Sequence, residues 1–154
     1  MMKIMFICLG NICRSPMAEF VMKDLVRKAG EEAEFVIASS ATSREEIGND
    51  THYGTRRMLD EMGVPYKKRA AVQLTRADYE KYDLLLGMDT ANLRGIERIV
   101  GGDPENKVHL LLDFAGEHRS IADPWYTGDF EATYRDVLCG CEALYAWVKK
   151  RHGA

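Results

Sequence analysis

Short apolar runs alternate with longer amphipathic stretches along most of the chain. Four of the apolar runs have the length and the bounding residues of buried strands, and they span 3–7, 34–39, 83–88 and 107–112. Apolar positions at helical spacing follow these runs and predict helices at about 15–29, 51–62, 75–81 and 89–100. Roughly the last 25 residues keep one apolar face throughout, which predicts a single long helix.

Residues that typically begin or end helices support these boundaries. Ser15 offers an N-cap directly before Pro16, which suits the first helical position, and Gly30 suits the end of the same helix. Thr75 begins a capping-box pattern for the short helix, and Asp89 can cap the next one. These signals place the start of the first helix only a few residues after the first strand.

Strands that alternate with helices predict a parallel sheet with helices on both of its faces. With four strands in 154 residues, we expect an α/β protein with a single domain over 1–154. Ligands of such sheets bind beyond the carboxyl ends of the strands. The loop that follows the first strand begins at Cys8, so a binding site is expected there.

Composition narrows the class of protein. Apolar residues are 46% and charged residues 29%, as in globular domains, and the net charge of −3 argues against a general nucleic-acid coat. No apolar run approaches the ~20 residues that span a bilayer, so no membrane partner is expected. The N-terminal apolar run is short and lacks a small-residue cleavage site. We therefore expect a cytoplasmic protein with free thiols, although an unconventional export route would leave no signal here.

The cysteines and histidines do not form a recognisable metal site. Structural zinc sites usually pair ligands across about two to four intervening residues, whereas the histidines here are scattered. We therefore expect no metal, and we interpret Cys139 and Cys141 as helix residues without chemistry. Cys8 and Cys13 remain to be explained.

The segment 8–16, Cys-Leu-Gly-Asn-Ile-Cys-Arg-Ser-Pro, has the features of an anion-binding loop. Between a strand and a helix, successive backbone N–H groups can turn inward, and the helix adds free amides and its positive dipole end. Arg14 can supply a two-pronged donor to phosphate oxygens. Gly10 permits a positive φ, and Asn11 tolerates one better than most residues.

The same loop surrounds Cys8 with groups that suit a nucleophile. The amides, Arg14 and the helix N-terminus favour the thiolate form, to which the Ser15 hydroxyl could donate. Attack of this thiolate on phosphorus would give a phosphocysteine intermediate. Alternatively, Cys8 could be a buried structural cysteine and Arg14 a surface arginine. We would favour that interpretation for a lone cysteine, but not for the complete segment 8–16 between a strand and a helix.

Asp123, followed by Pro124, Trp125 and Tyr126, is a candidate general acid. A bound phosphate dianion and nearby aromatic rings favour the protonated carboxyl, which could give its proton to the leaving oxygen. The resulting carboxylate could then activate water. Taken alone, Asp-Pro is more often an ordinary turn.

The segment 8–16 resembles the C-x4-C-R-S signature of the low-molecular-weight protein tyrosine phosphatase family. Further segments at 39–49, 88–94 and 123–126 resemble that family in the same order, so the resemblance covers nearly the whole chain. It implies a flavodoxin-like, phosphatase I-like fold and metal-independent hydrolysis of phosphotyrosine and small aryl phosphates, without a cofactor. It also implies a monomer that binds phosphotyrosine proteins or peptides, with phosphate or other oxyanions as product or inhibitor.

The resemblance implies a role for each matching residue. Cys8 would be the nucleophile, Arg14 would bind phosphate, and Asp123 would act first as acid and then as base. Asn11 and Ser39 would brace the loop, although each could be an ordinary turn or strand-end residue. The residues implied to contact substrate or phosphate are Leu9, Gly10, Asn11, Ile12, Cys13, Ser15, Trp125 and Tyr126.

Two other positions keep alternative interpretations. Cys13 could form a reversible disulfide with Cys8 under oxidation, as the resemblance implies, or be only a small buried side chain. Asp89 and Asn92, in the third matching segment, are interpreted as helix-capping residues with a structural role.

Apolar side chains at the mouth of the site indicate the substrate. Leu9 and Ile12, with Trp125 and Tyr126 opposite, would form a slot deep enough to favour an aryl phosphate. The branch of the family that resembles protein-arginine phosphatases carries Thr where this chain has Ile12, which favours phosphotyrosine.

The chain departs from the family pattern at several positions. Arg44 and Glu45 stand where an aromatic wall residue is common, which makes one side of the mouth polar and charged. An Asp that family members carry in the second helix region is replaced near His52. A His that family members often carry before the following short helix has no counterpart around 67–69. We interpret this basic run as a solvated face that could also attract acidic phosphopeptides. These departures bear on substrate preference and rate.

Three other functions fit parts of the sequence. An arsenate reductase on the same scaffold would need further cysteines near the third strand, and 75–100 contains none. A phosphocysteine carrier of sugar-transport systems would not need Asp123. A non-catalytic phosphate-binding module would have lost Cys8 or Arg14, and both are present.

Overall fold

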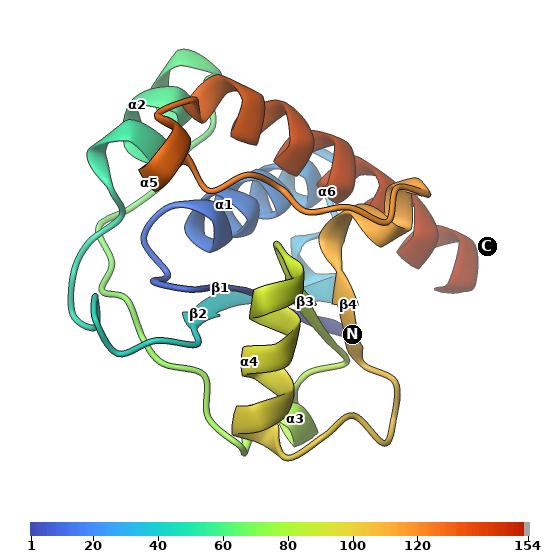
Figure 1. Ribbon diagram of the computed structural model, residues 1–154. Coiled ribbons are helices and arrows are strands. Elements are labelled where there is room, and N and C mark those ends of the chain that lie inside the picture. Colours follow the sequence, from blue (N-terminus) through green and yellow to red (C-terminus); the bar gives the residue numbers. More distant parts are fainter. Residues whose placement is uncertain (153–154) are drawn as a thin grey trace.

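Four parallel strands form the central sheet, as the alternation of strands and helices predicts. They are β1 (Met2–Cys8), β2 (Phe35–Ala41), β3 (Leu84–Gly87) and β4 (Val108–Leu110), in the spatial order β2-β1-β3-β4 (Figure 1). β1 pairs with β2 along its whole length, from Met2 opposite Phe35 to Cys8 opposite Ala41. The computed structural model describes residues 1–152.

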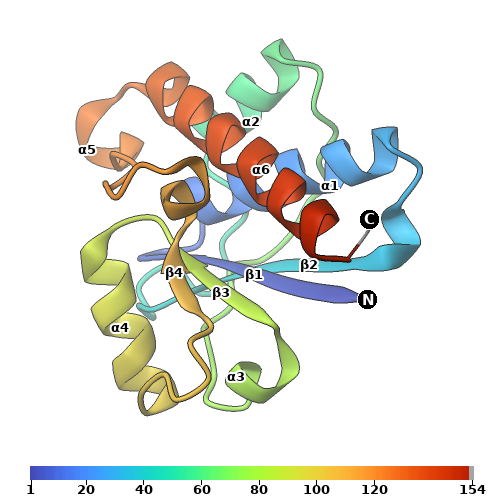
Figure 2. The same ribbon diagram turned by 90° about the vertical axis from the view of Figure 1, so that its right-hand side faces the viewer.

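Helices cover both faces of the sheet, which confirms the predicted α/β fold. They are α1 (Arg14–Lys28), α2 (Tyr53–Glu61), α3 (Asp78–Lys81), α4 (Thr90–Val100), α5 (Pro124–Thr127) and α6 (Phe130–His152), with the 3-10 helices η1 (Glu32–Glu34) and η2 (Leu111–Ala115). Figure 2 shows α1, α2 and α6 on one side of the sheet and α3 and α4 on the other. Within the described part of the chain, no helix is long and apolar enough to cross a membrane.

β1 is buried on both faces, which explains why its sequence is a continuous apolar run. Ile4 and Phe6 belong to the core cluster beneath α1 and α6. Met5 and Ile7 belong to the cluster on the α4 side, and all four side chains are at most 5% exposed. Because side chains alternate across a strand, one strand supports both core layers and fixes the position of Cys8 at its end.

The first helix begins at Arg14, two residues before the predicted first helical position at Pro16, and is not capped by Ser15. α1 starts at Arg14, so Ser15 and Pro16 lie inside its first turn. The Ser15 hydroxyl lies 3.0 Å from the Cys8 sulfur and is occupied by that contact. The prediction of Ser15 as N-cap is therefore wrong, because its hydroxyl serves the thiol instead.

Two other helix starts differ from the prediction. α2 begins at Tyr53 because His52 caps it, with Nδ1 accepting the Gly54 N–H at 3.0 Å. In the predicted capping box of α3, the Asp78 carboxylate does accept the Thr75 N–H at 2.9 Å. The helix itself starts only at Asp78, so Thr75 is not its cap.

The cap predicted for α4 is confirmed. Asp89 accepts the Asn92 N–H at 2.7 Å, and the Asn92 side chain accepts the Asp89 N–H at 3.1 Å in return. This reciprocal pair follows directly after β3. β4, in contrast, stops at Leu110, and the predicted strand residues 111–112 begin η2.

One edge of the sheet gathers the segments that carry the candidate chemistry. β1 ends at Cys8, whose carbonyl accepts the Thr42 N–H beyond the end of β2 at 3.0 Å. The Ile121 N–H donates to the Met88 carbonyl at 2.8 Å, which ties the segment before α5 to the end of β3. The loop after β1, the start of α4 and the segment around Asp123 therefore meet at the carboxyl edge of the sheet, as expected for a ligand site in this fold.

Candidate active site

The loop between β1 and α1 turns sharply at Asn11, which has a φ of 58°. Gly10 was expected to take such a conformation as well, but it is not among the residues with positive φ. A side chain at Gly10 would instead meet Glu46, with its Cβ 3.3 Å from Cγ of that residue. Gly10 therefore lets the Glu46 side chain pack closely against the loop, and Asn11 makes the left-handed turn.

The Cys8 thiol lies at the start of α1. Its sulfur is 3.0 Å from the Ser15 hydroxyl oxygen and accepts the Ser15 backbone N–H at 3.4 Å. Cys8 and Ser15 are both buried, so water competes little for these contacts. The free amide and the dipole of the helix N-terminus thus point at the sulfur, an arrangement that favours negative charge there.

Asn11 connects the loop to the sheet, as its expected bracing role requires. Its Nδ2 donates to the hydroxyls of Ser15 at 2.8 Å and Ser39 at 3.0 Å. Its Oδ1 accepts the Val72 N–H at 3.1 Å. Asn11 and Ser15 are fully buried behind the loop, so they support it and do not line the pocket described below.

Arg69 corrects the interpretation of residues 67–69 as a solvated basic face. Lys67 and Lys68 are exposed, but Arg69 is half-buried and donates to the Asn11 carbonyl at 2.9 Å and to the Asn11 Oδ1. Burial lowers the pKa of its guanidinium, and the nearby Glu19 partly offsets this effect. Arg69 braces the loop, a role that the local sequence did not indicate.

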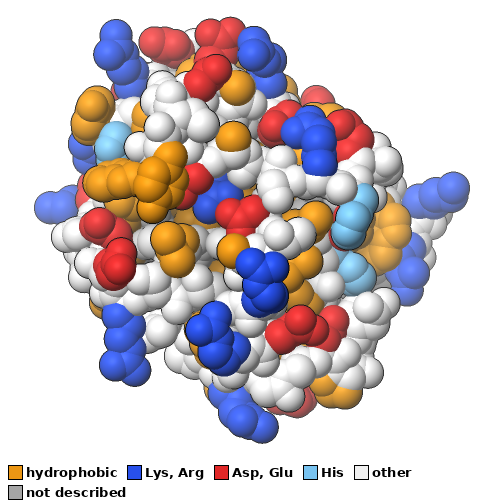
Figure 3. Space-filling view, in the orientation of Figure 1, with side chains coloured by type: hydrophobic (Ala, Val, Ile, Leu, Met, Phe, Trp, Pro, Cys, Tyr) orange, Lys and Arg blue, Asp and Glu red, His pale blue; other side chains and the backbone are white. Residues whose placement is uncertain are grey.

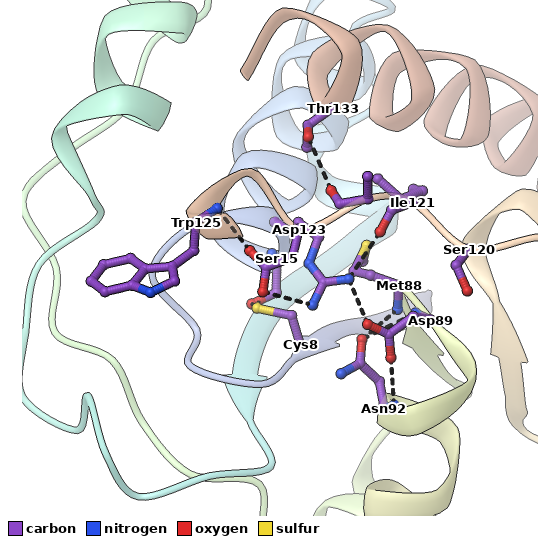
Figure 4. A network of polar contacts seen from close by, with 12 residues as sticks. Cys8, Ser15, Met88, Asp89, Asn92, Ser120, Ile121, Asp123, Trp125 and Thr133 are labelled. Carbon is purple, nitrogen blue, oxygen red and sulfur yellow. Dashed lines mark hydrogen bonds and ion pairs between the residues drawn. The ribbon is translucent and has the colours of Figure 1, made fainter. Parts of the chain in front are cut away.

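Arg14 lies buried between acceptors from two segments. Nη1 donates to Asp89 Oδ2 at 2.7 Å and to the Ile121 carbonyl at 2.9 Å, and Nη2 approaches Asp123 Oδ2 at 3.4 Å (Figure 4). Burial opposes the charge on Arg14, but Cys8 and the two carboxylates outweigh it and raise the pKa of the guanidinium. Asp89 is therefore more than a helix cap, and its second role was missed in the sequence.

Asp123 lies at the N-terminus of α5. Its Oδ1 accepts the Trp125 N–H at 3.0 Å, while its Oδ2 is the oxygen that faces Arg14. Pro124 occupies the first position of the helix, where its missing N–H is not needed. The Asp-Pro pair thus forms a capped turn that aims one carboxyl oxygen at the site.

A single pocket contains most of the predicted site residues. Its lining residues are Cys8, Leu9, Gly10, Ile12, Cys13, Arg14, Glu45, Glu46, Asp123, Trp125 and Tyr126. Leu9, Trp125 and Tyr126 are exposed apolar side chains that rim it. On this face of the molecule, hydrophobic side chains gather beside basic and acidic ones (Figure 3).

The expected polar side of the mouth is present, but it is built differently from the prediction. Glu45 and Glu46 line the pocket, whereas the Arg44 side chain turns to Gln73 Oε1 at 3.0 Å. His52, another departure from the family pattern, packs edge-on against the Trp125 ring at 5.5 Å. It therefore supports the aromatic wall.

The remaining cysteines differ in their surroundings. Burial, followed by the proximity of Cys8, raises the pKa of Cys13 to about 12, so it remains a thiol at neutral pH. Cys8 and Cys13 are both free. Cys139 is exposed and Cys141 is buried within α6, away from the pocket lining. Among the described residues, no group of three or more His, Cys, Asp or Glu side chains is placed to hold a metal ion.

The fold and the site together define an α/β protein with a pocket that contains a cysteine thiol, an arginine and an aspartate at the carboxyl end of the sheet. The family profile described as low molecular weight phosphotyrosine protein phosphatase matches residues 3–153. The low molecular weight protein-tyrosine-phosphatase YfkJ of Bacillus subtilis is 34% identical, over 97% of each chain. Its crystal structure has a TM-score of 0.95 and covers 99% of this chain and 97% of that chain.

Two further relatives extend the comparison. The low molecular weight phosphotyrosine protein phosphatase of Rattus norvegicus is 36% identical, over 97% of this chain and 95% of the rat protein. The crystal structure of a drosophila arginine phosphatase has a TM-score of 0.86 at 26% identity, and covers 96% of this chain and 98% of that one. The chain therefore belongs to the low molecular weight phosphotyrosine protein phosphatase family. The recognition and the enzyme class expected from the sequence are thereby confirmed.

Proposed function

We propose that this protein hydrolyses phosphotyrosine in proteins and peptides through a phosphocysteine intermediate on Cys8, without a metal ion. The observation that carries the proposal is the position of Cys8. Its sulfur lies against the Ser15 hydroxyl and N–H at the start of α1, in a pocket that also contains Arg14 and Asp123. A nucleophile, an oxyanion-binding group and an acid thus share one pocket.

In the first step, the phosphate group of the substrate lies against the loop amides and Arg14. The Cys8 sulfur attacks phosphorus, a sulfur–phosphorus bond forms, and the bond to the ester oxygen breaks. Asp123 gives its proton to that oxygen, so the neutral phenol leaves. Arg14 balances the charge on the transferring oxygens, a task that magnesium performs in other phosphoryl-transfer enzymes.

In the second step, water replaces sulfur on phosphorus. The Asp123 carboxylate takes a proton from the attacking water, phosphate forms, and the Cys8 thiolate leaves with the electron pair of the broken bond. The Ser15 hydroxyl and N–H stabilise that thiolate in both steps. The cycle is balanced, with water consumed and phosphate and phenol released, and it needs no cofactor.

The pocket favours an aryl ester. The apolar rim of Leu9, Trp125 and Tyr126 offers contact area to a phenyl ring, and Ile12 adds an apolar side chain below it. A phosphoserine would keep its backbone too close to this rim for its phosphate to reach Cys8. The similar drosophila protein is an arginine phosphatase by name, so phosphoarginine is the competing substrate that a test has to include.

The remaining expectations belong to the same proposal. We propose that the protein acts as a cytoplasmic monomer and that phosphate and other oxyanions inhibit it by occupying the loop. The orientation of Arg14 and the loop toward one small pocket supports oxyanion inhibition, because a tetrahedral anion needs the same donors as the substrate phosphate.

Matched peptides that carry phosphotyrosine, phosphoserine or phosphoarginine test the proposal, each measured with and without a chelator. We expect turnover of the phosphotyrosine peptide, no turnover by Cys8→Ser, and normal turnover by the matched control Cys139→Ser, whose thiol is exposed on α6. Activity on phosphoarginine alone would overturn the substrate assignment. Turnover that survives Cys8→Ser, or that disappears with the chelator, would overturn the mechanism.

A further inference from the structure

A chain of hydrogen bonds connects the candidate nucleophile to a carboxylate on the second turn of α1. Glu19 Oε1 accepts the Ser39 hydroxyl at 2.5 Å, and the Ser39 oxygen accepts from Asn11 Nδ2 at 3.0 Å. The same Nδ2 donates to Ser15 Oγ at 2.8 Å, and Ser15 Oγ lies 3.0 Å from the Cys8 sulfur. Four contacts therefore separate Glu19 from Cys8, and all of these residues are buried.

The donor-to-acceptor direction of these hydrogen bonds decides whether the Ser15 hydroxyl can donate its proton to the Cys8 sulfur. A hydroxyl has one proton, and it can either donate that proton to the sulfur or point it elsewhere. If Asn11 donates to the Ser15 oxygen, the Ser15 proton is free for the sulfur and stabilises a thiolate. If the Asn11 amide were turned over, its oxygen would face Ser15 and take that proton away from Cys8.

Two charged side chains hold the Asn11 amide in the first orientation. On the oxygen side, Arg69 and the Val72 N–H can only donate, so Oδ1 faces them. On the nitrogen side, an ionised carboxylate can only accept, so Glu19 takes the single Ser39 proton and leaves the Ser39 oxygen to accept from Asn11. Both ends of the chain require the same orientation.

The surroundings of Glu19 agree with this role. Its second oxygen, Oε2, pairs with Lys23 Nζ at 2.5 Å, which leaves Oε1 for Ser39. A competing acceptor for the Ser15 proton, the Ser40 carbonyl, is 3.5 Å away, farther than the Cys8 sulfur at 3.0 Å. The sulfur is therefore the better-placed acceptor.

We propose that Glu19 is a positioning residue for Cys8: through Ser39, Asn11 and Ser15 it fixes the direction of the hydrogen bonds so that the Ser15 proton points at the sulfur. The inference rests on the proposed function, because it matters only if Cys8 reacts as a thiolate. Glu19 itself lies outside the residues that line the pocket. It therefore does not contact the substrate, and the proposed effect passes through the hydrogen bonds.

The test measures the rate at which iodoacetamide alkylates Cys8 as a function of pH, in Glu19→Gln and in the unchanged protein. Loss of the charge removes one of the two constraints on the Asn11 amide and weakens the acceptor for the Ser39 proton, so the Ser15 proton is directed less strictly at the sulfur and the pH midpoint of alkylation should rise by about one unit. A simple electrostatic effect has the opposite sign, because removal of a nearby negative charge would lower the midpoint. The sign therefore separates the two mechanisms.

The charged groups near Cys8 stay the same in these variants, so they do not confound the comparison; they are Arg14, Glu45, Glu46, Arg69 and Asp123. The matched control is Asp24→Asn, which removes another buried carboxylate of α1. Asp24 pairs with Arg27 and Lys28, outside the chain of hydrogen bonds. Its loss should leave the midpoint unchanged.

A second background separates positioning from a general structural effect. In Ser15→Ala no hydroxyl remains to be oriented, so adding Glu19→Gln should cause no further shift of the midpoint. Ser39→Ala interrupts the series of hydrogen bonds at another point. It should raise the pH midpoint of alkylation even if Glu19→Gln does not fold. The proposal would be overturned if the pH midpoint of alkylation stayed unchanged or fell in Glu19→Gln and Ser39→Ala, whichever of them fold. It would also be overturned if Glu19→Gln shifted the midpoint equally with and without the Ser15 hydroxyl. Alkylation needs no phosphatase turnover, so these results are independent of the test of the proposed function.

Discussion

Asp89→Asn separates two tasks that one side chain performs. Asp89 Oδ1 caps α4 through the Asn92 N–H at 2.7 Å, and Oδ2 pairs with Arg14 at 2.7 Å. Asparagine and aspartate are about equally good N-caps, so the substitution keeps a capping oxygen and removes the charge. We therefore expect α4 to begin as before while Arg14 loses its shortest charged contact.

The expected decrease in kcat/KM of Asp89→Asn follows from the contacts of Arg14. It has three acceptors, of which Ile121 is an uncharged carbonyl at 2.9 Å and Asp123 lies at 3.4 Å. A hydrogen bond to a charged group contributes about 1.5–3 kcal/mol, and Arg14 is too deeply buried for water to replace it. If the loss falls on the transition state, at about 1.4 kcal/mol for each factor of ten, kcat/KM decreases roughly 10- to 100-fold.

The assay compares kcat/KM on a phosphotyrosine peptide with the free energy of unfolding in urea. Asp89→Asn should lose activity and the stability that the buried Arg14 contact contributes, whereas Asp89→Ala should lose about 1 kcal/mol more of the free energy of unfolding because the cap is also lost. The matched control is Asp129→Asn, a cap that accepts the Ala132 N–H at 2.9 Å at the start of α6. Unchanged kcat/KM in Asp89→Asn, or equal effects of Asn and Ala on both quantities, would refute the reasoning.

Three further predictions concern parts of the fold around the site. Burial, followed by the charge of Arg56, lowers the pKa of His52 from 6.5, and its neutral Nδ1 caps α2. The stability that this cap gives is present above pH 6.5 and is lost as the pH falls through the lowered value, so His52→Asn should flatten the pH dependence of unfolding in that range; an unchanged slope would contradict this. Gly54→Ala drives a Cβ into the Phe130 ring and should lower the free energy of unfolding by about 1–3 kcal/mol, measured in urea; full stability would show that the ring can move aside. Arg69→Met should reduce kcat/KM about tenfold or more by releasing the loop, while its exposed neighbour Lys68→Met should not, and equal values for the two would contradict the bracing role.

The fold could be predicted because its signals are local. The apolar run of β1 is buried on both faces, and helices such as α6 carry a continuous apolar stripe. The errors occur where a distant contact decides a local feature. Ser15 carries the usual signal of an N-cap, yet its hydroxyl lies against Cys8, which is seven residues earlier in the chain. A local pattern cannot show which of two hydrogen-bond partners a hydroxyl will choose.

The residues of the candidate site also fall into those that a local motif predicts and those that only distant contacts reveal. The segment 8–16 is contiguous, so its motif was visible in the sequence. Arg69 and Asp89 lie 58 and 75 residues away from their partners Asn11 and Arg14. Each already had a sufficient local explanation, as part of a basic run and as a helix cap, so the second role became apparent only in three dimensions. Glu19 resembles any polar residue of an amphipathic helix until Ser39 is placed beside it.

The most direct test of the account is to trap the phosphoryl group on Cys8. In Asp123→Ala, p-nitrophenyl phosphate should still react, because its leaving group needs little protonation, whereas hydrolysis of the intermediate should be slow without the base. Acid quench within the first turnover, followed by intact and peptide mass measurement, should reveal one phosphoryl group on Cys8 and none in Cys8→Ser. Turnover without any such adduct, or an adduct on a different side chain, would contradict the central claim.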